Sequence, residues 1–135
     1  MNLQQKLNRP LQFIQTALAL MWIYQGLVPK LLLRSPSELQ IWQFVGFDLA
    51  SAQIGVMVSG VLEILFGCVF LMWRKAILPH QLNILGLGTL LLLVMVVDPL
   101  QLTNAFNPVI MNVAMMVLSI VAIQLLQRIK NRHSA

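Results

Sequence analysis

Charged side chains are scarce in this sequence. Asp, Glu, Lys and Arg together make up 10% of it, whereas 59% of the residues are hydrophobic. A soluble domain carries about 25% charged residues, so this chain lacks the polar surface that would keep it in water. The composition excludes a soluble globular protein. It predicts an integral membrane protein, with a lipid bilayer around it and a single domain over residues 1–135.

Cysteine and histidine are also rare, with one Cys and two His. Cys68 has no partner for an intramolecular disulfide or a Cys-based metal site, and its apolar neighbours indicate a small buried hydrophobe. His80 is expected in a loop between two spans and His133 in the C-terminal tail, without a second ligand at metal spacing. We therefore predict no metal site. No Ser/His/Asp set and no Gly-rich phosphate loop is present, so no catalytic residue is assigned and any cofactor is unknown.

Four apolar segments are long enough to cross a bilayer, which takes about 20 residues of α-helix. They cover residues 11–29, 53–73, 77–97 and 108–127. The first is expected to be an uncleaved span, because its apolar run is longer than the core of a signal peptide. Backbone polar groups must be satisfied internally in lipid. We therefore predict an all-α protein that forms a transmembrane four-helix bundle.

The basic residues gather on one side of these spans. Seven lie before the first span, between the second and third, or after the fourth: Lys6, Arg9, Arg74, Lys75, Arg128, Lys130 and Arg132. The other side has Lys30 and Arg34. Because Lys and Arg are enriched in cytoplasmic loops, we predict that both termini are cytoplasmic. The same distribution explains the net charge of +5 without a nucleic-acid partner.

The connection between the first two spans contains "SPSELQIWQF", which begins at Ser35. Ser35 at the N-cap, Pro36 at the first helical position and Glu38 at the third form a capping box. This pattern predicts a short interfacial helix from Pro36 to Phe44 or Val45. Glu38 has two interpretations: it caps this helix, or it is an acid turned toward the mouth of the bundle.

A carboxylate, Glu63, lies within "GVLEILFG" near the middle of the second span. On insertion scales an acid there costs about 2.5–3.5 kcal/mol, so such residues usually face the protein interior and mark functional sites. Gly60 and Gly67 share its stripe of the helix, and small residues allow a neighbouring helix to approach. Glu63 is either a neutral acid that hydrogen-bonds two helices together or a charged group that faces a cation.

The first span supplies that cation. Gly26 and Lys30 lie on one face of the helix, one turn apart, and Gly26 and Pro29 are expected to bend its outer end. Lys30 has two interpretations. It extends outward to the membrane interface, as lysines commonly do, or it turns inward toward Glu63 or Glu38.

The fourth span opens with "FNPVIMN". Asn107 is suited to the N-cap and Pro108 to the first helical position, while Asn112 lies about one turn inside the membrane and needs a polar partner. We predict that the polar residues of the outer half form one outward-facing pocket in an apolar surrounding. Its members are Trp22, Lys30, Glu38, Glu63, Asn107 and Asn112.

Several of these stretches resemble the DoxX-like family of small bacterial membrane proteins. They are "YQGLVPKLL", "SPSE", "GVLEILFG", the "DP" at Asp98 and "FNPVIMN". The resemblance implies a multi-pass four-helix bundle in the bacterial inner membrane. The matching residues are Gly26, Pro29, Lys30, Glu38, Gly60, Glu63, Gly67, Pro99, Asn107, Pro108 and Asn112. The glycines and prolines among them are taken as structural. Relatives are fused to reductase domains, so the resemblance also implies a separate reductase or another membrane subunit as a partner.

Three functions follow from these observations. The first is a redox-associated accessory subunit that binds a quinone or another apolar molecule around Glu63, which would hydrogen-bond the head group or relay a proton. The second is a proton-coupled small-molecule transporter that uses Glu63 as its exchanging carboxylate. The third is an assembly or chaperone factor without a ligand, in which Glu63 holds helices together. Whether the protein is an enzyme stays open at this point.

Overall fold

The computed structural model describes residues 3–97, 99–103 and 107–133. Within these ranges it is helical and has four helices long and apolar enough to cross a membrane: Gln5–Leu32, Leu49–Met72, Leu78–Val97 and Val109–Asn131. The predicted all-α class with four spans is therefore confirmed. The cytoplasmic location of both termini stays a prediction, as does the assignment of residues 1–135 to one domain.

The chain separates into two compact units. The first, Ala17–Met72, is called the Glu63 unit. It comprises the second half of α1 (Leu3–Gln25), η1 (Gly26–Leu32), α2 (Pro36–Phe44) and α3 (Leu49–Met72). The second, called the His80 unit, combines the start of α1, up to Thr16, with the chain from Trp73 onward. It contains α4 (Leu78–Val97), η2 (Pro99–Thr103) and α5 (Pro108–His133).

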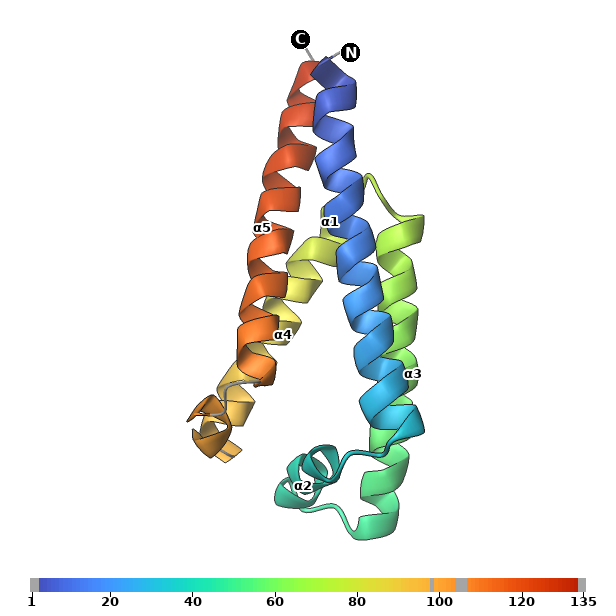
Figure 1. The fold of residues 1–135 in the computed structure, drawn as a ribbon, viewed down its shortest axis with the longest axis vertical. Coiled ribbons are helices and arrows are strands. Elements are labelled where there is room, and N and C mark those ends of the chain that lie inside the picture. Colours follow the sequence, from blue (N-terminus) through green and yellow to red (C-terminus); the bar gives the residue numbers. More distant parts are fainter. Residues whose placement is uncertain (1–2, 98, 104–106, 134–135) are drawn as a thin grey trace. The chain divides into compact units, whose positions relative to one another are not determined.

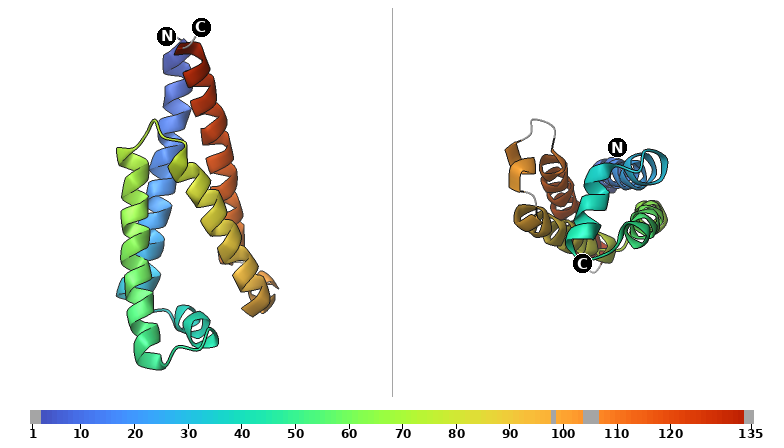
Figure 2. Two further views of the ribbon diagram at one scale, coloured as in Figure 1. Left: turned by 180° about the vertical axis from the view of Figure 1, so that it is seen from behind. Right: turned by 90° about the horizontal axis from the view of Figure 1, so that it is seen from below.

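In the Glu63 unit, the second half of α1 and η1 lie along α3, as both side views show (Figures 1 and 2). η1 is a π-helix with Pro29 inside it. A proline in an α-helix lacks the N–H of the i−4 bond, and its ring clashes with the i−4 carbonyl, which is that of Gln25 here. The wider turn avoids this conflict, and Leu33 N donates to Val28 O at 2.9 Å. The expected bend at the end of the first span is thus a change of helix type, of the kind often found at functional sites.

The short helix α2 forms over Pro36–Phe44 with Pro36 in its first turn, as the sequence predicts. The capping box was wrong, however. The Ser35 side chain makes no capping hydrogen bond, and its Oγ lies 2.8 Å from the Oγ of Ser37. Glu38 is directed to Lys30 instead, since an ion pair with a lysine stabilises a carboxylate more than a neutral backbone N–H does.

Asp48 immediately precedes α3 and is fully exposed. A hydrogen bond with the Ser51 side chain lowers the pKa of Asp48 below its usual 3.8, because it favours the charged carboxylate. The resulting stabilisation is present above that usual value and is lost as the pH falls through the lowered pKa. We expect Ser51→Ala to raise the pKa of Asp48 toward 3.8, measured by carboxyl-carbon NMR against pH. The Ser59→Ala variant serves as the control, and an unchanged pKa in Ser51→Ala would contradict this account.

In the His80 unit, α4 and α5 lie side by side, and the first turns of α1 lie along the last turns of α5 (Figure 1). The core at that end contains Leu11 of α1 with Ala122 and Leu126 of α5, all buried. Large apolar side chains on the outer faces are exposed, among them Leu85 and Val96 of α4. Such a surface is suited to lipid rather than to water.

Candidate functional site

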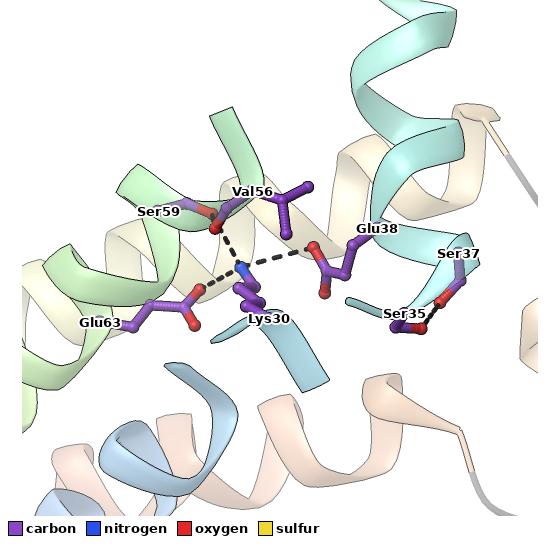
Figure 3. A network of polar contacts seen from close by, with 7 residues as sticks. All are labelled: Lys30, Ser35, Ser37, Glu38, Val56, Ser59 and Glu63. Carbon is purple, nitrogen blue, oxygen red and sulfur yellow. Dashed lines mark hydrogen bonds and ion pairs between the residues drawn. The ribbon is translucent and has the colours of Figure 1, made fainter. Parts of the chain in front are cut away.

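Lys30 is at the centre of a polar cluster in the Glu63 unit (Figure 3). Its Nζ lies 2.5 Å from Glu63 Oε1 on α3 and 3.4 Å from Glu38 Oε2 on α2. It also makes a long contact of 3.5 Å with Ser59 Oγ, whose hydroxyl donates to Val56 O at 2.9 Å. An ammonium group has three N–H donors, and each has an acceptor here. Of the two interpretations of Lys30, the structure therefore agrees with the inward one, because the side chain is directed toward Glu63 and Glu38.

The cluster is shielded from solvent to different degrees. The side chains of Lys30 and Glu63 are 11% and 16% exposed, whereas that of Glu38 is 28% exposed. Glu63 is the fifteenth residue of α3, about 21 Å from the start of that helix, so this carboxylate lies well inside a candidate span, whereas Lys30 lies near the end of its own. Lys30 and Glu63 therefore neutralise each other where an isolated charge would be costly, and Glu38 adds a negative charge at the outer edge.

Two glycines bring Lys30 within reach of Glu63. A Cβ atom on Gly60 would lie 2.8 Å from the carbonyl O of Gly26 and 3.0 Å from Lys30 Cβ. Neither Gly60 nor Gly26 has room for a side chain, so the backbones of η1 and α3 are in contact. This close approach explains why these positions carry glycine in an otherwise bulky apolar sequence. Gly67 has the same role about two turns further along α3, against Ala19 O.

Trp22 lies on α1, two turns before Lys30. It is buried, and its ring packs edge-to-face on Phe66 with centroids 5.0 Å apart. Phe66 in turn contacts Phe70, with centroids 5.2 Å apart. Trp22 therefore belongs to an aromatic core between α1 and α3, which such pairs stabilise beyond their buried area.

A small cavity of about 40 Å³ borders the cluster. Its walls come from η1, α2, α3 and the connection between η1 and α2, and it is lined by Lys30, Arg34, Leu39, Gln53, Val56 and Met57. A volume of that size holds about one water molecule, whereas pockets for drug-sized ligands measure about 300–1,000 Å³. Inside the cluster, Glu63 Oε2 is buried and has no hydrogen-bond partner among the residues described. The site therefore contains a buried carboxylate oxygen that accepts no hydrogen bond from the described residues, next to the ion pair between Lys30 and Glu63.

The other predicted site residues belong to the His80 unit. Asn107 Oδ1 accepts a hydrogen bond from Ile110 N at 3.0 Å, which caps α5 as its sequence position predicts. Pro108 begins α5 and Pro99 begins η2. Asn112 is buried, and its Oδ1 has no partner among the residues described. Whether the two asparagines join Lys30 and Glu63 in one pocket stays a prediction, and Asp98 of the "DP" pair lies outside the described residues.

A second polar network was missed by the sequence analysis. Asn83 of α4 donates to Ser119 Oγ at 2.7 Å and to Met115 O at 3.1 Å, both on α5. His80 Nδ1 lies 3.4 Å from the same Ser119 Oγ, and His80 Nε2 lies 3.4 Å from Gln15 Nε2 on α1. Four buried polar side chains thus connect three helices.

The placement of His80 in a loop was wrong. It lies in the first turn of α4 and is 1% exposed. Helical spacing could have identified it, because His80, Asn83, Leu87 and Val94 are all buried and share one face. Pro79 belongs to the same first turn, a position to which proline is well suited.

Within the described residues, no group of three or more His, Cys, Asp or Glu side chains is arranged to hold a metal ion. A lysine supplies hydrogen-bond donors, and two carboxylates supply acceptors of different exposure.

Comparison with known proteins identifies the family of this chain. The model of the DoxX-like family matches residues 19–120, a segment that includes the Lys30, Glu38 and Glu63 cluster, the glycine contacts around it, and the start of α5. No curated protein and no solved structure matches the chain. The family match covers most of the sequence, and the protein is a member of the DoxX-like family with four membrane-spanning helices.

Proposed function

We propose that this DoxX-like protein is a redox-associated accessory subunit of the bacterial inner membrane. In this proposal it binds a quinone, or a similar apolar molecule with a polar head, at Lys30, Glu38 and Glu63. The observation that carries the proposal is the Glu63 Oε2 atom, a buried acceptor without a partner among the described residues. Leaving a buried polar atom unpaired costs about 1–3 kcal/mol, or more for a charged group. A ligand donor that reaches Oε2 would recover that free energy.

The chemistry of the cluster matches both redox forms of such a head group. A quinol hydroxyl can donate to Glu63 Oε2, and a quinone carbonyl can accept from Lys30 Nζ. The contacts of Lys30 to Glu38 and Ser59 measure 3.4 and 3.5 Å, so a ligand oxygen can replace either more easily than it can replace Glu63. Glu63 then orients the head group, and any electron transfer belongs to a separate reductase or membrane subunit.

Entry of a ring-sized ligand requires a side chain to move, because the cavity beside Lys30 measures about 40 Å³. Leu39 of α2 is the best candidate. It lines the cavity, and α2 has no buried residue. The contact of Trp42 with Gly55 holds α2 against α3, since a Cβ atom on Gly55 would lie 2.8 Å from the Trp42 ring. A helix held by so few buried side chains can be displaced at low cost.

The test is to titrate a short-chain benzoquinol into the purified full-length protein in lipid nanodiscs and to follow tryptophan fluorescence. We expect Glu63→Gln to weaken binding about 10- to 100-fold, as expected for loss of a hydrogen bond to a charged group. Ser59→Ala is the matched control, because it removes the longest contact of Lys30 and leaves the ion pair intact. It should change the affinity by less than threefold.

Co-purified small molecules, identified by mass spectrometry from wild type and Glu63→Gln, provide a second readout. A quinone enriched in the wild type alone would support the proposal. Equal binding by both proteins would overturn the role of Glu63. Proton release on adding a cationic substrate would favour the transporter, in which the cation would have to replace Lys30 as the partner of Glu63. Absence of any ligand from both proteins would favour an assembly factor.

A further inference from the structure

The His80 unit contains a much larger cavity, of about 590 Å³, which the proposed function does not use. Its walls come from the start of α1, the connection that precedes α4, and the last turns of α5. The volume falls within the range of about 300–1,000 Å³ that is typical of ligand pockets. Because the connection joins two candidate spans, this end of the unit lies at a membrane surface.

The walls of the cavity combine apolar and basic side chains. Leu11 and Leu126 belong to the buried core at this end and provide an apolar wall. Arg74, Lys75 and Lys130 line the same cavity, and none of the described residues that line it is acidic. A basic pocket between membrane-spanning helices is suited to the head group of an anionic lipid, and its apolar wall is suited to an acyl chain.

Basic side chains far outnumber acidic ones in the sequence of the His80 unit. Seven of the nine Lys and Arg residues belong to the His80 unit, because the other two, Lys30 and Arg34, belong to the Glu63 unit. Asp98 is the one Asp or Glu in the sequence of the His80 unit. In the sequence it follows the last residue of α4, whereas Arg74 and Lys75 precede the first.

Gln15 provides a polar side chain in the wall of the cavity. It is 1% exposed, and its Nε2 donates to Arg74 O at 2.8 Å. That bond fixes the amide orientation, since the other orientation would place two acceptors together. Its Oε1 is buried and has no partner among the described residues. A ligand hydroxyl that donates to this atom would supply the missing hydrogen bond.

We propose that this cavity binds an anionic phospholipid whose head group carries a hydroxyl, as a glycerol head group does. The phosphate contacts Arg74, Lys75 and Lys130, a head-group hydroxyl donates to Gln15 Oε1, and an acyl chain lies against Leu11 and Leu126. Arginine binds phosphate with two parallel hydrogen bonds. The bound lipid would hold the ends of α1 and α5 and the connection before α4 together at the basic end of the unit.

The experiment is native mass spectrometry of the intact chain in a mild detergent, titrated with phosphatidylglycerol or phosphatidylcholine. We expect the wild type to bind phosphatidylglycerol at least tenfold more tightly. Each basic residue near an anionic lipid contributes about fivefold. The triple variant Arg74→Gln, Lys75→Gln, Lys130→Gln should therefore lose at least tenfold in affinity. The control, Lys6→Gln, Arg9→Gln, Arg128→Gln, has the same net charge but spares the cavity, and it should lose less than threefold.

A steric variant keeps the proposal testable if the triple variant does not fold. Gln12 lines the cavity and is exposed, so Gln12→Trp should fill part of it and weaken phosphatidylglycerol binding without changing the charge. Equal losses in the two triple variants would assign the affinity to general surface charge and overturn the proposal. Displacement of the lipid by millimolar inorganic phosphate would identify a site for soluble anions and would also overturn it.

Discussion

Replacing Lys30 with methionine is expected to lower the free energy of unfolding by about 3–5 kcal/mol, because it leaves Glu63 buried in a membrane span without its cation. The two side chains are 11% and 16% exposed and their charged atoms are 2.5 Å apart, so solvent cannot replace the lost partner. Glu38 cannot compensate, because it is also an acid. The measurement is reversible unfolding of the wild type and Lys30→Met in mixed micelles.

The double variant Lys30→Met, Glu63→Gln completes a thermodynamic cycle. It removes both charges and is expected to recover most of the loss, because replacing a whole buried pair costs far less than breaking it. Glu38→Gln is a further control and should cost less than about 1 kcal/mol, since this more exposed acid resembles a surface partner. Additive effects of the two single changes would show that Lys30 and Glu63 do not interact energetically, and the proposed ligand site would lose its basis.

Gly60→Ala is expected to destabilise the protein by about 1–3 kcal/mol, the usual cost of overpacking a tight contact. The added methyl group would meet the carbonyl O of Gly26 at 2.8 Å and Lys30 Cβ at 3.0 Å. Backbone atoms cannot move aside as a flexible side chain can, so η1 must separate from α3. The separation also lengthens the contact between Lys30 and Glu63. Thermal unfolding in nanodiscs measures the effect.

The chain provides a matched control on another helix. Gly86 of α4 has nothing within 4 Å of the place where a Cβ would lie. Gly86→Ala should therefore stabilise the protein by about 0.5–1 kcal/mol through helix propensity alone. Opposite signs for the two substitutions would establish that close helix approach selects glycine at position 60. If both substitutions stabilised the protein, the contact between Gly26 and Gly60 would not be a tight one.

The sequence alone is sufficient for the helical class, the four spans and the short helix after Pro36. These features depend on composition and local periodicity, which each segment carries by itself. Local signals have limits even here. The capping box at Ser35 and Glu38 was a valid local pattern, but Lys30 provides Glu38 with a charged partner. A pattern within four residues cannot reveal that competition.

The candidate site shows what only the tertiary structure decided. The sequence identified Lys30 and Glu63 as unusual residues but left two directions open for the lysine. The choice depends on a contact between residues 33 positions apart, made by the close approach of Gly26 to Gly60. The burial of His80 and the assembly of the basic cavity likewise depend on packing between α1, α4 and α5. Hydropathy determined that these segments are membrane helices, whereas side-chain packing between them determined which polar groups meet.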